Sequence, residues 1–190
     1  MRAFLAVDVS EPSRSAVAAL QRRLSSTKAS VVWVAPPNLH LTLAFLGDID
    51  EAVRNALEPR LAEVAAVLPP WTASLGDIGA FPNFRNPQVL WIGLARGSER
   101  LITLAQAIHT VVAHAGVSPE SREFVPHLTF GRVRANGARM QPHLEEAQGA
   151  WRVPQEWTVS SFRLYQSRLS SAGPTYSVLR DFAFTRADGA

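Results

Sequence analysis

Hydrophobic and polar residues follow each other along the chain in two periods, one typical of strands and one typical of helices. Short apolar or alternating runs predict strands, and apolar residues spaced three or four apart between start and stop signals predict helices. The predicted strands cover residues 3–9, 31–34, 39–46, 71–78, 89–94, 124–133, 157–166 and 175–184. The predicted helices cover residues 10–24, 51–68 and 98–114, residues 79–87 form a loop, and residues 135–150 form a weak helix or an irregular segment. This mixture predicts an α+β protein.

The order of these elements occurs twice. Strand, helix, strand with His and Thr, helix and strand occupy residues 3–78, and the same series returns over residues 89–166. Phe4 precedes His40 by 36 positions and Leu90 precedes His127 by 37, so the spacing agrees as well. A repeated series predicts a duplicated unit with pseudo-two-fold symmetry. We therefore expect one domain over residues 1–190, with equivalent strands facing each other.

Two short stretches lie at equivalent positions of this repeat, His40-Leu41-Thr42-Leu43 and His127-Leu128-Thr129-Phe130. Alternate side chains of a strand share a face. Each stretch therefore places an imidazole and a hydroxyl on one face and two hydrophobic side chains on the other. One such stretch carries little information, but two at matched positions in a chain with five His predict a single site built from both.

Paired imidazoles are suited to acid–base catalysis because the pKa of histidine, about 6.5, lies near neutral pH. One ring can activate the oxygen that enters at phosphorus while the other protonates the oxygen that leaves. The Thr hydroxyls can donate to non-bridging phosphate oxygens. A metal site is the main alternative, but neither stretch holds a carboxylate within its strand, and Asp48 lies beyond the first. The symmetry leaves open which His is the acid.

Composition excludes several other classes of protein. The 190 residues contain no Cys, which excludes disulfides, thiolate nucleophiles and Cys-bound metals. No Gly-rich phosphate loop or Gly-x-Ser-x-Gly stretch supports nucleotide triphosphate hydrolysis or serine hydrolase chemistry. Arg outnumbers Lys 18 to 1, but the net charge is only +3, so charge alone does not identify a nucleic-acid partner. No apolar run approaches the ~20 residues that cross a bilayer and no signal peptide is evident, which predicts a cytoplasmic protein.

The paired stretches resemble the motifs of the 2H phosphoesterase superfamily. Within it, the chain is similar to the RNA 2′,3′-cyclic phosphodiesterases, also called 2′-5′ RNA ligases. The similarity covers nearly the whole chain and includes residues 1–7, 37–47, 126–133 and 164–169. It implies a two-lobed fold with a mainly antiparallel sheet and flanking helices in each lobe. The active site is then expected in the central cleft between the lobes.

The resemblance also implies a reaction and the residues that perform it. The reaction is opening of RNA 2′,3′-cyclic phosphodiester ends to 2′-phosphomonoesters, without a metal ion or another cofactor. The substrate is such an RNA or a small cyclic nucleotide. His40 is implied as the proton donor and His127 as the proton acceptor, while Thr42 and Thr129 hold the phosphate oxygens.

Three further residues are expected to bind substrate. Arg132 and Phe45 each lie five positions after the His of their stretch, where the family makes ligand contacts. Strict alternation would turn both away from the His face, so Gly47 and Gly131 are expected to permit a bulge or a strand end that re-aims them. Ser167, just after the predicted strand 157–166, is the third expected contact.

The sequence leaves two other functions open. The same site can run toward synthesis and join a cyclic end to a 5′-hydroxyl in a 2′-5′ linkage. The chain can also be a nucleotide- or RNA-binding module without turnover, although phosphate binding alone favours Arg or Lys over titrating imidazoles. No exposed heptad seam is evident. We expect a monomer that binds RNA and does not bind a membrane.

Overall fold

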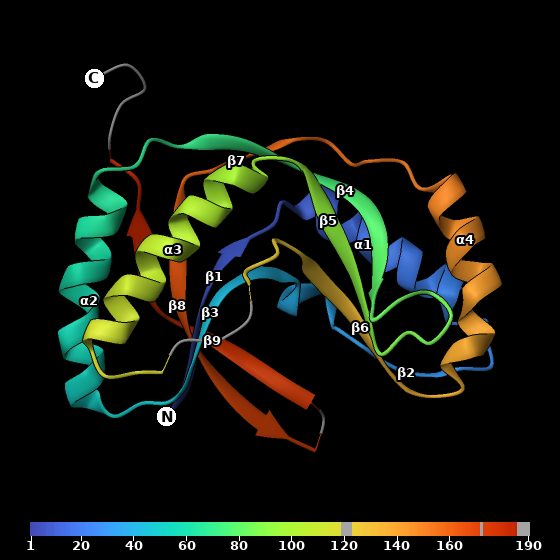
Figure 1. Ribbon diagram of the computed structural model, residues 1–190, viewed down its shortest axis with the longest axis horizontal. Coiled ribbons are helices and arrows are strands. Elements are labelled where there is room, and N and C mark those ends of the chain that lie inside the picture. Colours follow the sequence, from blue (N-terminus) through green and yellow to red (C-terminus); the bar gives the residue numbers. More distant parts are fainter. Residues whose placement is uncertain (119–122, 172, 186–190) are drawn as a thin grey trace.

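The computed structural model describes residues 1–118, 123–171 and 173–185 (Figure 1). Within these residues the strands are β1 (Arg2–Asp8), β2 (Ser30–Trp33), β3 (His40–Asp48), β4 (Trp71–Phe81), β5 (Val89–Arg96), β6 (Leu128–Ala135), β7 (Trp157–Val159), β8 (Ser161–Ser170) and β9 (Gly173–Ala183). The α-helices are α1 (Glu11–Leu24), α2 (Glu51–Ala66), α3 (Ser98–His114) and α4 (Gln141–Ala150). Two short 3₁₀ helices are η1 (Pro36–Asn38) and η2 (Gly137–Met140).

The strands form one antiparallel sheet that narrows at its middle. The order is β7-β4-β5-β6-β3-β1-β8-β9, and β2 pairs with β6. β3 and β6 are joined through one residue pair, Leu41 with Leu128. The sheet separates there into a His40 lobe (β3, β1, β8 and β9) and a His127 lobe (β6, β5, β4, β7 and β2) (Figure 1). The predicted α+β fold, with a mainly antiparallel sheet in each lobe, is confirmed.

Each lobe carries two helices, one from each half of the chain. α2 and α3 pack on the His40 lobe, and α1 and α4 pack on the His127 lobe (Figure 1). α1 directly follows β1 of the His40 lobe, and α3 directly follows β5 of the His127 lobe. The chain therefore crosses to the opposite lobe at each of these connections, and neither lobe is built from one continuous half of the sequence.

The helices begin where the sequence predicts and bury one face. The Ser10 side chain accepts from the Ser13 backbone amide, and Asp50 accepts from that of Val53, so both caps satisfy a free amide of the first turn. Apolar residues of the helices and of the adjacent sheet face form one core that runs through both lobes. The opposite face of the sheet carries the predicted catalytic residues, and we call it the site face.

Several predicted boundaries differ from the structure. β4 continues to Phe81, into the predicted loop 79–87, because this end of the strand pairs with β5. The predicted strand 124–133 begins only at Leu128 and continues to Ala135. No helix in the described residues is long and apolar enough to span a membrane.

The end of the chain also differs in detail. The predicted strand 157–166 is interrupted at Ser160, and its second part, β8, continues to Ser170. Ser167 therefore lies inside a strand and not after one. The weak segment 135–150 contains η2 and a regular helix, α4.

Candidate active site

The four motif residues come together because β3 and β6 run antiparallel where the lobes meet. The central Leu pair of this junction is buried in the core. The residues on either side of that pair place His40 opposite Thr129, and Thr42 opposite His127. All four side chains consequently lie on the site face. The structure thus brings the two predicted stretches into one site.

Both His side chains are oriented by the same local contact. Nδ1 of His40 lies 2.7 Å from the carbonyl oxygen of Asn38, and Nδ1 of His127 lies 2.7 Å from that of Val125. A carbonyl oxygen only accepts hydrogen bonds, so Nδ1 carries the hydrogen in each ring. Nε2 is left for chemistry in both rings. In His40 it lies 3.0 Å from the Thr42 hydroxyl, which donates to it when the ring is neutral.

His40 sits in a packed aromatic wall. Its ring stacks on Phe4 with centroids 4.8 Å apart and meets the edge of Tyr176 at 5.4 Å. Burial lowers the pKa of His40, while the hydrogen bond to Asn38 and the charge of Asp8 act in the opposite direction. The net effect favours the neutral form of the His40 ring in the free protein.

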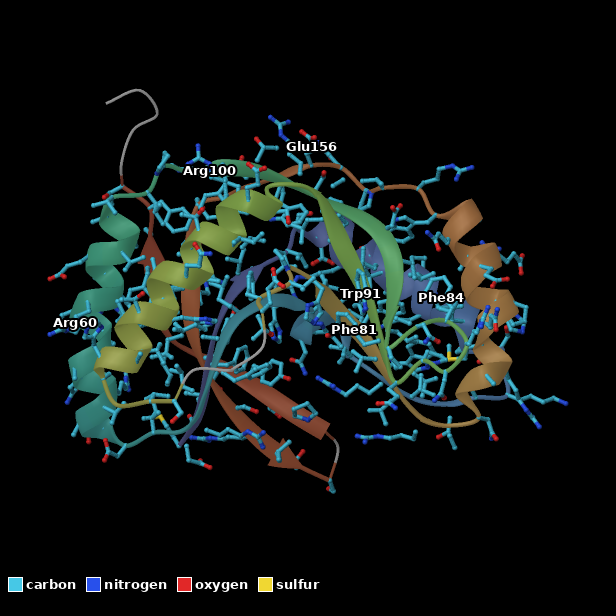
Figure 2. The ribbon with its side chains drawn as sticks, viewed as in Figure 1. Arg60, Phe81, Phe84, Trp91, Arg100 and Glu156 are labelled. Atoms are coloured by element: carbon cyan, nitrogen blue, oxygen red, sulfur yellow. The ribbon has the colours of Figure 1, made fainter. Side chains whose placement is uncertain are left out.

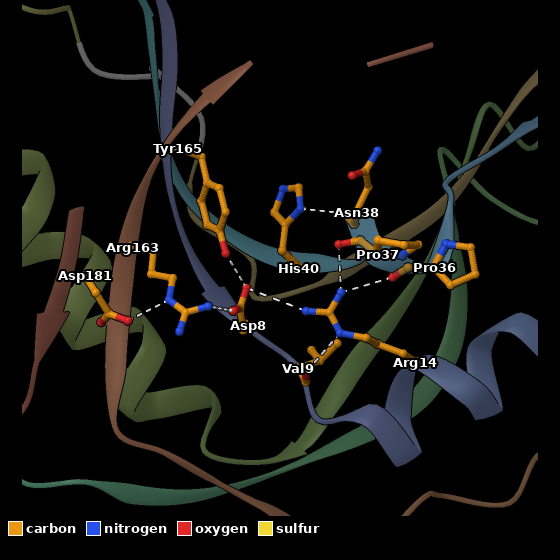
Figure 3. Close-up of polar contacts among 10 residues, drawn as sticks. All are labelled: Asp8, Val9, Arg14, Pro36, Pro37, Asn38, His40, Arg163, Tyr165 and Asp181. Atoms are coloured by element: carbon orange, nitrogen blue, oxygen red, sulfur yellow. Dashed lines mark hydrogen bonds and ion pairs between the residues drawn. The ribbon is translucent and has the colours of Figure 1, made fainter. Parts of the chain in front are cut away.

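Asp8 is the centre of a polar network beside His40 (Figure 3). It pairs with His40 in the β1–β3 register, so the two side chains share the site face. Its carboxylate accepts from the Tyr165 hydroxyl at 2.6 Å and from Arg163, and it forms an ion pair with Arg14 at 3.7 Å. Burial and the bond to Asp8 raise the pKa of Tyr165 to about 12, which keeps its hydroxyl a donor. The network therefore places two opposed charges beside the buried imidazole: the Asp8 carboxylate raises the pKa of His40, and the Arg14 guanidinium lowers it.

Arg14 also shapes the segment that leads into His40. Its guanidinium donates to the carbonyl oxygens of Pro36 and Pro37 at 3.1 and 2.8 Å (Figure 3). The Asn38 side chain donates to the carbonyl oxygen of Pro174 at 2.9 Å, at the start of β9. These bonds hold η1, and η1 presents the Asn38 carbonyl group that orients the imidazole. Asp8 and Arg14 were not among the predicted site residues, since their roles depend on contacts between distant segments.

The wall around His127 has a different composition. The edge of Phe81 meets the ring with centroids 5.4 Å apart, and Trp91 lies at 6.2 Å. Trp91 is paired with Thr129 in the β5–β6 register, so its side chain belongs to the site face. Both aromatic residues come from strands of the His127 lobe.

A bulge in β3 turns Phe45 to the site face. Ala6 and Leu5 are neighbours in β1, but they pair with Thr42 and Ala44 of β3. Leu43 is therefore an extra residue without a partner in β1, which is a β-bulge. Phe45 is 52% exposed, whereas Leu43 and Ala44 before it are buried. The expectation that Gly47 re-aims Phe45 is wrong, because the bulge lies before Phe45 and contains no glycine. A second register shift does lie next to Gly47.

β6 contains the equivalent bulge. Consecutive residues of β5 pair with Thr129 and Gly131, and Phe130 is the extra residue. Gly131 lies in this bulge, as its sequence position indicated. Arg132 is consequently exposed on the site face. Burial raises the pKa of Tyr176, and the positive charge of Arg132 acts in the opposite direction.

A side chain from a crossing helix holds the carbonyl oxygen of each bulge. His109 of α3 donates from Nε2 to the carbonyl oxygen of Leu43 at 3.0 Å. Gln21 of α1 donates to the carbonyl oxygen of Phe130 at 2.9 Å. Gln21 is buried, and a polar residue on the apolar face of a helix is the one signal in the sequence for this role.

Ser167 lies farther out on the same sheet. It follows Tyr165 by two positions, so it shares that residue's face, and it pairs with Tyr176 of β9. In the described residues, no three or more His, Cys, Asp or Glu side chains are grouped as metal ligands.

Solved structures with this fold identify the class of protein. A crystal structure of a Thermus thermophilus protein matches with a TM-score of 0.81 at 29% identity, over 99% of this chain and 100% of that one. E. coli LigT complexed with 3′-AMP matches with a TM-score of 0.74 at 26% identity, over 97% and 98%. The two-lobed fold and the paired His and Thr stretches are those of a 2H phosphoesterase. The chain belongs to the 2′-5′ RNA ligase superfamily, whose family model matches residues 9–170.

Relatives of similar length share one name. A protein of Methanothermobacter thermautotrophicus is 36% identical over 184 residues, and one of Archaeoglobus fulgidus is 37% identical over 186 residues. These alignments cover 96% of this chain and 98% and 99% of the respective relatives. Both relatives are named RNA 2′,3′-cyclic phosphodiesterase.

Proposed function

We propose that this protein opens 2′,3′-cyclic phosphodiester ends of RNA to 2′-phosphomonoesters by acid–base catalysis with its two His, without a metal ion. The observation that carries the proposal is the register of β3 and β6. It sets each imidazole opposite the hydroxyl of the other stretch, and each ring has Nε2 free of the bond that orients it. The names of the curated relatives support the substrate class.

His127 takes a proton from water as the water oxygen attacks phosphorus. The bond from phosphorus to O3′ breaks, and His40 gives its Nε2 proton to O3′. The products are a 2′-phosphomonoester and a 3′-hydroxyl. This assignment of donor and acceptor follows the family resemblance, because the symmetry of the two strands does not distinguish them.

The lowered pKa of His40 in the free protein fits a donor that becomes protonated when substrate binds. An anionic phosphate beside a buried imidazole favours its protonated form. Binding of the cyclic phosphate therefore raises the pKa of His40 and prepares it to protonate O3′. The Asp8 carboxylate acts in the same direction.

The remaining predicted residues bind the substrate. Thr42 and Thr129 donate to the non-bridging phosphate oxygens, and Arg132 adds a charged donor on the same face. Phe45 and Ser167 contact the nucleotide from the His40 lobe.

The direct test offers an RNA oligonucleotide with a 2′,3′-cyclic end and locates the product phosphate by ³¹P NMR. We expect phosphate on O2′ and an unchanged rate in EDTA. A product with phosphate on O3′, no product, or strong inhibition by EDTA would contradict the proposal.

A second candidate reaction is ligation at the same site. The matching family model is described as the 2′-5′ RNA ligase superfamily, and this description is the reason to consider ligation. Ligation needs a base that accepts the proton of an attacking 5′-hydroxyl, and His127 has the same task toward water in hydrolysis. Adding a 5′-hydroxyl RNA to the assay, with resistance of the junction to a 3′-5′-specific nuclease as the readout, tests whether a 2′-5′ linkage forms.

A further inference from the structure

We propose that Arg14 is a positioning residue for the reaction, which fixes the ring orientation and the tautomer of His40 through the short helix η1. Arg14 acts on backbone carbonyl groups, and these in turn act on the imidazole. The expected effect on the rate rests on the function proposed above, whereas the state of the ring can be measured without substrate.

The Arg14 guanidinium joins the end of β1 to η1. It donates to the carbonyl oxygens of Pro36 and Pro37 at 3.1 and 2.8 Å, and its Nε donates to that of Val9 at 3.2 Å (Figure 3). Its remaining nitrogen lies 3.7 Å from the Asp8 carboxylate. A guanidinium presents its donors in a rigid planar fork, and this side chain is only 16% exposed. These bonds therefore define one position of η1 relative to β1.

The helix η1 ends at the group that orients His40. The Asn38 carbonyl oxygen lies 2.7 Å from Nδ1 of the ring, so the hydrogen of the neutral ring is on Nδ1. Nε2 is then free to take up a proton and to pass it to O3′. If the Asn38 carbonyl group moves, the neutral ring can carry its hydrogen on Nε2, where it can no longer accept a proton. The donor role of His40 thus depends on the position of one backbone oxygen.

The helix α1 relates this turn to the other catalytic imidazole. Arg14 and Gln21 are seven residues apart, which is two helical turns, so both lie on the same side of α1. Gln21 donates to the carbonyl oxygen of Phe130 at 2.9 Å, in the bulge of the strand that follows His127. One helix therefore holds both the strand of His127 and the turn before His40, and Arg14 makes the second of these contacts.

The charge of Arg14 does not explain its place beside a proton donor. The Arg14 charge lowers the pKa of His40, which disfavours the protonated ring, and the Asp8 carboxylate acts in the opposite direction. Tyr165 and Tyr176, which also face the ring, are uncharged at neutral pH because burial raises the pKa of both hydroxyls. The contribution that favours catalysis is therefore geometric and comes from the bonds to the backbone.

Ring ¹⁵N NMR of the free protein tests the tautomer directly. Above the pKa of the rings, wild type should carry the hydrogen on Nδ1 in both His40 and His127. Arg14→Gln removes the fork, so we expect part of the His40 population to carry its hydrogen on Nε2, with His127 unchanged. Arg14→Lys keeps the charge but not the planar fork, and we expect the same change.

Kinetics on an RNA with a 2′,3′-cyclic end test the consequence. Misplacement of a reacting group costs up to about 100-fold, so kcat should fall roughly 10- to 100-fold in both Arg14 variants, with KM nearly unchanged. Arg23→Gln is the matched control, because it removes the same charge from α1 together with an exposed ion pair to Glu146. It should behave as wild type in both measurements.

A second variant changes the same turn without altering charge. Asn38→Ala removes the bond from the Asn38 side chain to the Pro174 carbonyl oxygen, so its own carbonyl group loses one support. We expect a smaller shift of His40 toward the Nε2–H form. Thermal melts establish which variants are folded, and Asn38→Ala and Arg14→Lys decide the matter if Arg14→Gln is not.

The outcomes separate this inference from the proposed function. A wild-type protein that does not open the cyclic end contradicts the proposed function, and the NMR measurement still decides the inference. If folded Arg14 variants keep the Nδ1–H tautomer of His40, the positioning role is overturned, whether or not kcat falls. Wild-type behaviour of Arg14→Lys alone also overturns it, because the role is then one of charge.

Discussion

At the scale of single residues, the two imidazoles differ in their surroundings although their backbone contacts are the same. His40 is enclosed by Phe4, Tyr165 and Tyr176, and burial lowers its pKa. His127 meets the edge of Phe81 on a more open wall. The symmetric sequence motif therefore produces an asymmetric pair, which agrees with the separate donor and acceptor roles that we propose.

Replacing Asp8 by Asn should lower the pKa of His40 further. The carboxylate favours the imidazolium form by its charge, so its removal leaves burial less opposed. An NMR titration of the His40 ring measures the shift. Asp181→Asn is the matched control, because Asp181 binds Arg163 from the side away from His40 and should leave the titration unchanged (Figure 3). An unchanged or raised pKa in Asp8→Asn would show that the network does not act on His40.

Replacing Arg132 by Gln should lower kcat/KM, because the variant lacks a charged donor to the substrate. A hydrogen bond to a charged group contributes about 1.5–3 kcal/mol, so kcat/KM for an RNA cyclic phosphate should fall roughly 10- to 100-fold. Arg60→Gln removes the same charge from an exposed position of α2, remote from the site face (Figure 2), and should have little effect. Equal losses in the two variants would indicate a general effect of net charge.

The residues with the most distinctive chemistry could be predicted from the sequence, whereas those that support them could not. His40 and His127 were found because a rare residue type occurred at matched positions. Asp8 and Arg14 were not found, because single carboxylates and guanidiniums are common and gain meaning only from neighbours distant in sequence. Trp91 gave no signal alone, and its position depends on Gly79 in another strand.

At the scale of elements, the bulges of β3 and β6 decide which side chains reach the site face. Gly131 marks one of them in the sequence, whereas the bulge at Leu43 contains no glycine and has no local signal. The strands and helices themselves follow from hydrophobic periodicity and caps. Which lobe each helix packs against could not be predicted. Periodicity shows that a helix buries one face, but it does not show which strands that face contacts.

The bond from α3 to the β3 bulge should contribute to stability. His109→Leu leaves the Leu43 carbonyl group without this donor, and an unsatisfied buried group costs about 1–3 kcal/mol in the free energy of unfolding. His109→Gln supplies an amide donor like that of Gln21 in the other lobe and should restore part of this loss. Urea unfolding measures both variants, and equal stability of the two would contradict the role of the bond.

At the scale of the whole molecule, the crossing of α1 and α3 ties the two lobes together. α1 packs on β6 and α3 packs on β3, so each half of the chain supplies part of the other's core. We infer from this exchange that residues 1–190 form one domain. The expected monomeric state stays a prediction.

Cutting the chain between β4 and β5 should therefore yield two halves that do not fold alone. Each half would expose the apolar face of a helix and leave the β3–β6 junction unpaired. Circular dichroism should show no cooperative thermal transition for residues 1–85 or 86–190 separately, and should show one for the intact chain. A cooperative transition in either isolated half would mean that the lobes are independent.

The central claim is that His40 and His127 act together on one phosphate, and single-turnover rates on an RNA with a 2′,3′-cyclic end test it most directly. General acid–base catalysis contributes about 10²–10⁴-fold per group. His40→Ala and His127→Ala should each lose at least ~100-fold in rate, with the thermal transition of the fold retained. A wild-type rate in either folded variant would contradict the account.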